Sequence, residues 1–286
     1  MQEFTTTSTS PAARMAARRD AFLGVVAERR AIMGILNVTP DSFSDGGKFE
    51  GLDAAITQAK KLAADGADII DVGAESTRPG HTPISADEEI ARLAPLLDAL
   101  LGAVDAPFSI DTYKAATARY AVERGVSVIN DVWGLQRDPA MADVVAETGA
   151  AVVVMHNRES VDASLDITED MKRFFDRSLD LARKAGILRA NIMLDPGIGF
   201  GKTKAQNLAA LRATDRLATE YGLPVLIGVS RKSLFGLLLG ADVDARLIGT
   251  IAANLATLAR GARVFRVHDV AEHKAAFAVW DAIEHG

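Results

Sequence analysis

Eight short apolar segments recur along the chain, and each is continuous rather than alternating with polar residues. They span 31–38, 68–73, 107–112, 126–132, 150–156, 191–195, 224–229 and 263–268. Continuous apolar runs are typical of parallel strands that are covered on both faces. Helical patterns separate most of the runs, and several end in glycine, a common helix stop. The pattern predicts an α/β fold, a (β/α)8 TIM barrel. A doubly wound open sheet is the alternative, although it normally holds fewer strands.

The chain is predicted to form a single domain after a short leading segment. Residues 1–30 are expected to form a polar tail and a leading helix, and residues 31–286 the barrel. Two long segments rich in Gly, Pro, Ser and Thr, 39–49 and 75–89, follow the first and second strands. Loops of this length after barrel strands commonly act as lids that exclude water.

Composition excludes several classes of function. The net charge is −6 and the chain has no long basic run, which argues against nucleic acid or an anionic membrane as the main partner. The absence of cysteine excludes disulfides, thiolate metal sites and cysteine nucleophiles. No apolar run approaches the roughly 20 residues of a membrane helix. The first residues lack the apolar stretch of a secretory signal, so we expect a cytoplasmic protein.

The stretch DPGIGFGKT, residues 195–203, invites comparison with a phosphate-binding P-loop. A P-loop needs glycine five residues before its Gly-Lys-Ser/Thr ending, because successive backbone N–H groups wrap the phosphates. Pro196 stands at that position, and proline has no N–H to donate. The stretch is therefore not a P-loop. It places the carboxylate of Asp195 and the ring of Phe200 at the rim of the sheet.

Polar residues stand at the end of almost every predicted strand, which is where the chemistry of a barrel is located. They are Asn37, Asp71 or Glu75, Asp111, Asn130 with Asp131, His156, Asp195, Ser230 with Arg231 and Lys232, and Arg266 with His268. A polar side chain at the end of an apolar strand is costly unless it is paired or meets a ligand. Their convergence predicts a functional site at this end of the barrel.

The residue types indicate a group transfer controlled by binding, orientation and charge. Asp111, Asn130 and Asp195 can read the edge of a flat heterocycle. Four cationic or ionisable groups can bind an anion: Arg78, Lys232, Arg266 and His268. No serine has an obvious histidine partner, and no His/Asp/Glu cluster has zinc spacing.

Seven sequence blocks together resemble the dihydropteroate synthase family, the folate-pathway enzymes blocked by sulfonamides. The blocks are MGILNVTPDSFSDGG (33–47), GADIIDVGAESTRPG (66–80), SIDTYK (109–114), INDVWG (129–134), DPGIGFGKT (195–203), GVSRKSLFG (228–236) and RVHDV (266–270). The resemblance runs from Ala31 to the C-terminus. It implies a transferase of folate biosynthesis that condenses 6-hydroxymethyl-7,8-dihydropterin diphosphate with p-aminobenzoate to give 7,8-dihydropteroate and diphosphate by dissociative substitution. It also implies Mg²⁺ as cofactor and a homodimer.

The resemblance assigns roles to individual residues. Those implied to hold the pterin diphosphate are Asn37, Thr77, Asp111, Asn130, Met155, Asp195, Lys232, Arg266 and His268, with Asn37 as the Mg²⁺ ligand. Those implied to hold p-aminobenzoate are Phe43, Thr77, Arg78, Pro79, Phe200 and Ser233, the last of them near a helix N-terminus that favours anions. The implied catalytic residues are Asp111, Asp195, Lys232, Arg266 and His268.

Two other functions are compatible with the same residues. A pterin-dependent methyltransferase would share the pterin pocket but would not need SRKS together with both lid loops. A pterin-binding protein without turnover would have no diphosphate to hold, so retention of Arg266 and His268 argues against it. The chain departs from the family pattern at Ala74, where glycine is common, and at Asn157, where methionine is more usual.

Overall fold

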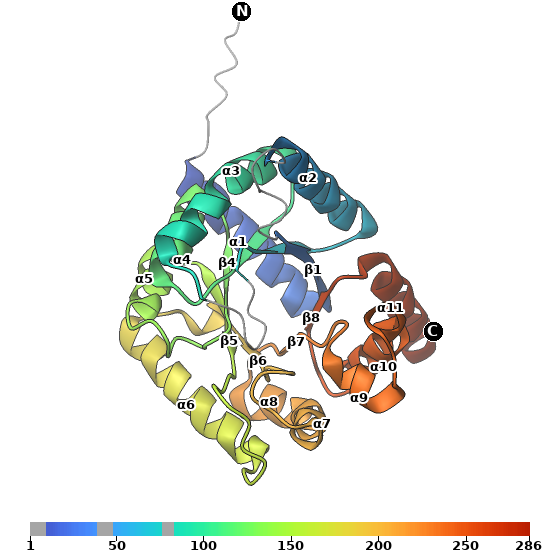
Figure 1. Ribbon diagram of the computed structural model, residues 1–286. Coiled ribbons are helices and arrows are strands. Elements are labelled where there is room, and N and C mark those ends of the chain that lie inside the picture. The colour runs from blue at the N-terminus through green and yellow to red at the C-terminus, as the bar shows by residue number, and fades with distance from the viewer. Residues whose placement is uncertain (1–9, 39–47, 76–82) are drawn as a thin grey trace, which may run out of the picture.

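The computed structural model describes residues 10–38, 48–75 and 83–286 (Figure 1). Within them, eight parallel strands form one sheet in the order β6-β5-β4-β3-β2-β1-β8-β7. The strands are β1 (Ala31–Asn37), β2 (Ile69–Gly73), β3 (Phe108–Asp111), β4 (Val128–Asp131), β5 (Ala151–Met155), β6 (Ile192–Asp195), β7 (Leu226–Ile227) and β8 (Val264–Val267). A parallel bridge between Leu194 and Val225 joins β6 to the start of β7 and closes the ring. The predicted TIM barrel is confirmed.

Helices surround this ring (Figure 1). They are α1 (Pro11–Glu28), α2 (Lys48–Asp65), α3 (Ala86–Ala103), α4 (Ala115–Arg124), α5 (Met141–Thr148), α6 (Ile167–Ala185), α7 (Lys204–Arg212), α8 (Thr214–Tyr221), α9 (Ser233–Leu239), α10 (Leu247–Leu258) and α11 (Val270–His285), with short 3-10 turns η2 (Arg189–Asn191) and η3 (Val243–Arg246). The pattern over 206–222 predicts one helix, but the structure has two, α7 and α8, which meet at Ala213. The predicted loop 75–89 is also shorter, because α3 begins at Ala86 behind a capping box made by Ser85 and Glu88.

Successive strand residues face opposite sides of the barrel wall and produce two separate apolar layers. Ile70, Val72 and Phe108 face outward and pack beneath the helices in the larger core cluster. Met33, Ile69 and similar inward residues form a second cluster inside the ring. Both layers are buried, which is why the strands read as continuous apolar runs.

Helix α1 supplies the floor of the barrel. Phe22 and Val26 are only 1% and 2% exposed and belong to the inner cluster together with Ala31 and Met33. In Figure 1 this blue helix crosses the ring of strands. The interior is therefore filled from the N-terminal ends of the strands, and any ligand has to enter from their C-terminal ends.

A search of the described helices finds none that is long and apolar enough to cross a membrane. The cytoplasmic location expected from the sequence stays a prediction.

Candidate active site

The inward positions of the strands change from apolar to polar toward their C-terminal ends. Two residues after inward Ile69, Val128, Met193 and Val264 stand Asp71, Asn130, Asp195 and Arg266. All three of the acid and amide residues in that set are at most 4% exposed. Because side chains alternate between the two faces of each strand, these charged and amide side chains form an inner layer directly above the apolar floor.

Arg266 joins two carboxylates across this layer. Its Nε donates to Asp71 Oδ2 at 2.6 Å and its Nη2 donates to Asp111 Oδ2 at 2.9 Å. Asn130 Nδ2 also donates to Asp71 Oδ2, at 3.1 Å. Burial disfavours the guanidinium charge, but the two carboxylates outweigh it and raise the pKa of Arg266. From the sequence, Asp71 was named only as one of two carboxylates at the end of its strand, and no role was assigned to it. Its position two residues after Ile69 in DIIDVG could have indicated that it faces inward.

Burial disfavours the negative charge of Asp111, whose residue is only 6% exposed. Burial raises its pKa to about 7, and Asp71 adds to the shift while Arg266 opposes it. Among the described residues, no group hydrogen-bonds to its Oδ1 atom. A Cβ built on Gly73 would lie 3.9 Å from both Asp111 Oδ2 and Asn37 Oδ1, so these two oxygens flank the same glycine. A buried carboxylate with one unsatisfied oxygen is suited to a cationic partner that arrives with a ligand.

The DPGIGFGKT segment forms a tight loop after β6. Gly197 has φ +64°, and a Cβ there would lie 1.8 Å from the carbonyl oxygen of His156, so no other residue fits. Its N–H donates to Asp195 Oδ1 at 2.7 Å. The buried ammonium of Lys202 donates to the carbonyl oxygens of Gly197 at 2.8 Å and Phe200 at 3.1 Å. The lysine of this motif therefore closes the loop on itself, and burial lowers its pKa to about 7.

Lys232 lies between β7 and α9, as the N-cap residue of α9, and its side chain reaches this loop. Its Nζ donates to the carbonyl oxygen of Ile198 and lies 4.3 Å from the centroid of the Phe200 ring. Burial lowers its pKa to about 8, although the charge of Asp195 works in the other direction. Burial raises the pKa of Asp195, which the Lys232 charge opposes. Each of these two charges therefore favours the ionised form of the other.

His268 and Ser230 connect the last two strands. Ser230 Oγ lies 3.0 Å from His268 Nδ1 and accepts a hydrogen bond from the His268 N–H at 3.1 Å. Asp269, which follows His268 in the sequence, accepts from Arg231 Nε at 3.0 Å. Ser233 is the exposed first residue of α9. Because α9 has only seven residues, the anion contact predicted for Ser233 would depend on the serine hydroxyl more than on a helix dipole.

Asp131 and His156 each follow an inward residue, so their side chains face outward, away from the site. Asp131 accepts from the N–H groups of Trp133 at 2.8 Å and Leu135 at 2.6 Å, and so fixes the turn after β4. His156 is fully buried against Phe174, with its Nε2 3.2 Å from Asp170 Oδ2. The expectation that every strand-end polar group converges on one site is wrong for these two residues and for Arg231, whose guanidinium contacts Asp269.

The structure brings a defined subset of the predicted residues to the mouth: Asn37, Asp111, Asn130, Met155, Asp195, Phe200, Lys232, Arg266 and His268. Met155 pairs in register with Asp195 and is buried. The predicted residues Phe43, Thr77, Arg78 and Pro79 lie outside the described residues. The roles assigned to individual residues stay predictions.

The two departures from the family pattern lie just outside this layer. Ala74 is buried, and its carbonyl oxygen accepts from Arg92 Nη1 at 3.4 Å. Asn157 Nδ2 donates to the carbonyl oxygen of Val132 at 2.9 Å, and its Oδ1 accepts from the Arg158 N–H at 2.7 Å. Asn157 therefore ties the end of β5 to the end of β4.

Comparison with known proteins places this geometry in a family. The family described as pterin-binding enzymes matches residues 33–268. The dihydropteroate synthase of Clostridium beijerinckii is 46% identical over 259 residues, which cover 90% of this chain and 96% of that protein.

Solved structures agree with the sequence comparison. A dihydropteroate synthase from Clostridium difficile, crystallised in the presence of pteroic acid, superposes with a TM-score of 0.86 at 47% identity, covering 91% of this chain and 98% of that one. The Xanthomonas albilineans enzyme with 4-aminobenzoic acid gives a TM-score of 0.85 at 41% identity, covering 91% and 94%. This chain therefore belongs to the pterin-binding enzymes, within the dihydropteroate synthases, a family of transferases.

Proposed function

We propose that this protein condenses 6-hydroxymethyl-7,8-dihydropterin diphosphate with p-aminobenzoate to give 7,8-dihydropteroate and diphosphate. The observation that carries the proposal is the buried inner layer, in which Asp111, Asn130 and Asp195 lie with the cations of Lys232 and Arg266. The solved relatives that contain pteroic acid and 4-aminobenzoic acid support the same pair of reactants.

The pterin lies in the mouth between Asp195 and Lys232. The free lone pairs of Asp195 suit the amino and ring N–H donors of a pterin, and the Lys232 ammonium suits its carbonyl and ring-nitrogen acceptors. Asn130 and Met155 line the same space from β4 and β5. Lys232 exchanges its bond to the Ile198 carbonyl for the pterin as the ligand enters. A charge-assisted bond to a flat heterocycle orients the reacting methylene group.

The diphosphate lies toward β1 and β8, where Asn37, Arg266 and His268 reach the mouth, with Thr77 from the second loop. The described inner layer has three carboxylates, Asp71, Asp111 and Asp195, which face two partly buried cations, Lys232 and Arg266. The buried Lys202 ammonium also acts on Asp195, but it is bound to backbone carbonyls. A further cation is needed to balance a diphosphate there.

Mg²⁺ fits this requirement. Asn37 Oδ1 supplies one hard oxygen ligand, and Mg²⁺ typically takes most of its remaining ligands from phosphate and water. No cluster of three or more His, Asp or Glu residues that could hold a metal occurs among the described residues, so the ion depends on the diphosphate. Bound there, Mg²⁺ would neutralise charge on the leaving group. Activity should disappear with a chelator and return with added Mg²⁺.

The reaction proceeds by dissociation and capture. The bond between the pterin methylene carbon and the diphosphate oxygen breaks, and its electron pair leaves with the diphosphate. The carboxylate of Asp111 stabilises the resulting pterin-methyl cation. The lone pair of the neutral aromatic amine then forms the C–N bond, and the amine proton passes to solvent or to diphosphate. Because the amine is neutral, no strong base is required.

The p-aminobenzoate is held at the outer edge of the mouth. Phe200 packs on its ring beside Lys232, and the Ser233 hydroxyl meets its carboxylate. Phe43, Thr77, Arg78 and Pro79 complete this site in the proposal. Sulfonamides have the shape of p-aminobenzoate, so we expect them to inhibit in competition with it.

Diphosphate release that depends on p-aminobenzoate tests the proposal. Lys232→Ala and Asp195→Asn should each lower kcat/KM at least tenfold, about 1.4 kcal/mol of transition-state stabilisation. Unchanged kinetics in both variants would rule out the proposed pterin pocket. Tight pterin binding without release would instead indicate a methyltransferase or a binding protein.

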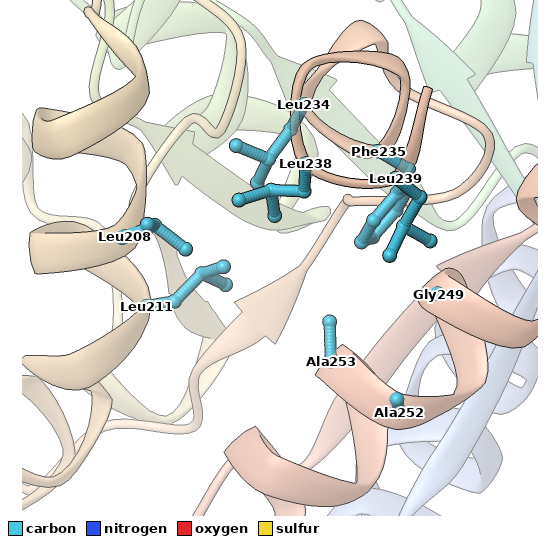
Figure 2. A pocket seen from close by; sticks show the side chains of 9 residues that line it. All are labelled: Leu208, Leu211, Leu234, Phe235, Leu238, Leu239, Gly249, Ala252 and Ala253. Carbon is cyan, nitrogen blue, oxygen red and sulfur yellow. The ribbon is translucent and has the colours of Figure 1, made fainter. Parts of the chain in front are cut away.

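We propose further that a second copy of this chain covers the face made by α9, α10 and α11. Seven of the nine large hydrophobic residues that are exposed in the described chain lie there: Leu237, Leu238, Leu239, Val243, Ile248, Val279 and Ile283. An apolar cavity of about 240 Å³ lies beside this face. Figure 2 shows Leu208 and Leu211 of α7 facing Leu234 and Leu238 of α9 across it.

Sedimentation velocity tests the homodimer. The wild-type chain should sediment as a dimer, and Ile248→Lys should shift it to the monomer. Leu188→Lys is the matched control, because Leu188 is 67% exposed but lies before β6, away from this face. A monomeric wild type, or equal behaviour of the two variants, would contradict the proposal.

A further inference from the structure

The residue before Lys232 has a backbone conformation that residues other than glycine rarely adopt. Arg231 has φ +55°, and within the described chain Leu135 is its one non-glycine companion with a positive φ. Such a conformation persists only where the surroundings determine it strongly, and it commonly lies at functional sites. Here the turn connects Ser230, the partner of His268, to Lys232 and Ser233.

Both backbone polar groups of Arg231 are held by residues beyond α9, at the end of η3 and in the first turn of α10. Its N–H donates to Thr250 Oγ1 at 3.1 Å, and its carbonyl oxygen accepts from Arg246 Nη1 at 3.1 Å. Thr250 is fully buried and donates in turn to the carbonyl oxygen of Arg246 at 2.9 Å. The start of α10 therefore fixes the peptide groups on either side of the strained residue.

The side chain of Arg231 ties the same turn to the neighbouring strand. Its guanidinium makes a two-point contact with the carboxylate of Asp269, in which Nε donates to Oδ2 at 3.0 Å and Nη2 donates to Oδ1. Asp269 directly follows His268. One residue thus fixes the turn between β7 and α9, which carries Lys232, relative to the end of β8, where Arg266 and His268 stand.

We propose that Arg231 is a positioning residue that, with Asp269, Thr250 and Arg246, holds the 230–233 turn so that Lys232 and Ser233 face the mouth. This inference deepens the proposed function and rests on it, since Lys232 and Ser233 hold the two substrates there. Arg231 acts through its neighbours, because its guanidinium contacts Asp269 beyond the inner layer.

The test compares variants that differ by one contact. Arg231→Gly relieves the backbone strain but removes the Asp269 contact. Thr250→Val removes the hydroxyl that accepts from Arg231, whereas Thr250→Ser retains it. Arg260→Lys is the matched control, because Arg260 is exposed at the far end of α10 and donates only locally, to the Ala256 carbonyl oxygen.

Steady-state kinetics for both substrates, a fluorescence titration with 6-hydroxymethylpterin, and thermal unfolding give the readouts. Arg231→Gly should keep the melting temperature within a few degrees of wild type and lower kcat/KM at least tenfold, with weaker pterin binding. Thr250→Val should also lower kcat/KM, and Thr250→Ser should restore it to about the wild-type value. A purely structural role would instead lower the melting temperature and leave kcat/KM per folded molecule unchanged.

Wild-type kcat/KM in Arg231→Gly, or a Thr250→Ser variant as impaired as Thr250→Val, would overturn the inference. Failure of the proposed function looks different, because the wild-type protein itself would then release no diphosphate in the presence of p-aminobenzoate.

Discussion

Replacement of Asp71 by asparagine should move the acid limb of the pH profile without removing the site. Asp71 is fully buried and accepts from Arg266 Nε at 2.6 Å and Asn130 Nδ2 at 3.1 Å. Asparagine keeps one oxygen for these donors but removes a negative charge that raises the pKa of Asp111. The pKa of Asp111, about 7 in the wild type, should therefore fall in Asp71→Asn.

The geometry sets the size of this shift. Two carboxylates bound to one guanidinium are separated by roughly 5 Å, and at an effective dielectric constant near 20 they repel by about 3 kcal/mol. Arg266 lies between Asp71 and Asp111 and offsets part of this repulsion. We therefore expect a shift of about one pKa unit, which corresponds to about 1.4 kcal/mol.

The assay measures kcat/KM for the pterin diphosphate from pH 5 to 9, with diphosphate release as the signal. In the wild type, kcat/KM should fall as the pH drops through about 7, because Asp111 takes up a proton and no longer stabilises the cation. In Asp71→Asn the same fall should occur about one pH unit lower. Asp131→Asn is the control, since burial also raises the pKa of Asp131, to about 6, but this side chain faces away from the mouth.

An acid limb that stays in place in Asp71→Asn, or that moves equally in Asp131→Asn, would refute the assignment of the limb to Asp111. Thermal unfolding of both variants confirms that the comparison is made between folded proteins.

Three further changes test the scaffold. Gly197→Ala should unfold the loop after β6 and abolish pterin binding, because its Cβ would clash with the His156 carbonyl; a normal Kd by titration would contradict this. Burial lowers the pKa of Lys202 to about 7, so above pH 7 the unfolded state binds more protons than the folded state and the unfolding free energy should rise with pH toward 10. Urea titrations should show a smaller rise in Lys202→Met. An equal rise in the variant would contradict the buried charge. Phe22→Ala should cost about 3–5 kcal/mol of unfolding free energy and leave kcat unchanged below the melting temperature, whereas a loss of kcat would place α1 in the site rather than in the floor.

Much of the fold could be predicted because burial on both faces leaves a simple pattern. In DIIDVG, Ile69 faces the inner cluster and Ile70 and Val72 face the outer one, so residues on both faces of the strand are apolar. The same holds for the other strands. The division of the 206–222 helix at Ala213 could not be predicted, because neither glycine nor proline marks it.

The site was predictable only where a residue both faces inward from its strand and has a polar side chain. Asn130, Asp195 and Arg266 stand at inward positions and are polar, so their convergence follows from the fold. His156 and Asp131 have the right chemistry but the wrong parity.

Lys202 and Arg231 could not be assigned from sequence, because their functions depend on backbone carbonyls and on a left-handed turn that only coordinates show. Their motifs resembled a phosphate loop and a basic cluster, respectively.

The central claim is most directly tested by measuring diphosphate release from 6-hydroxymethyl-7,8-dihydropterin diphosphate with Mg²⁺, with and without p-aminobenzoate, while 7,8-dihydropteroate is detected in parallel. The account predicts release that requires p-aminobenzoate and equals dihydropteroate formation mole for mole. Release that ignores p-aminobenzoate, or pterin binding with no release at all, would contradict it.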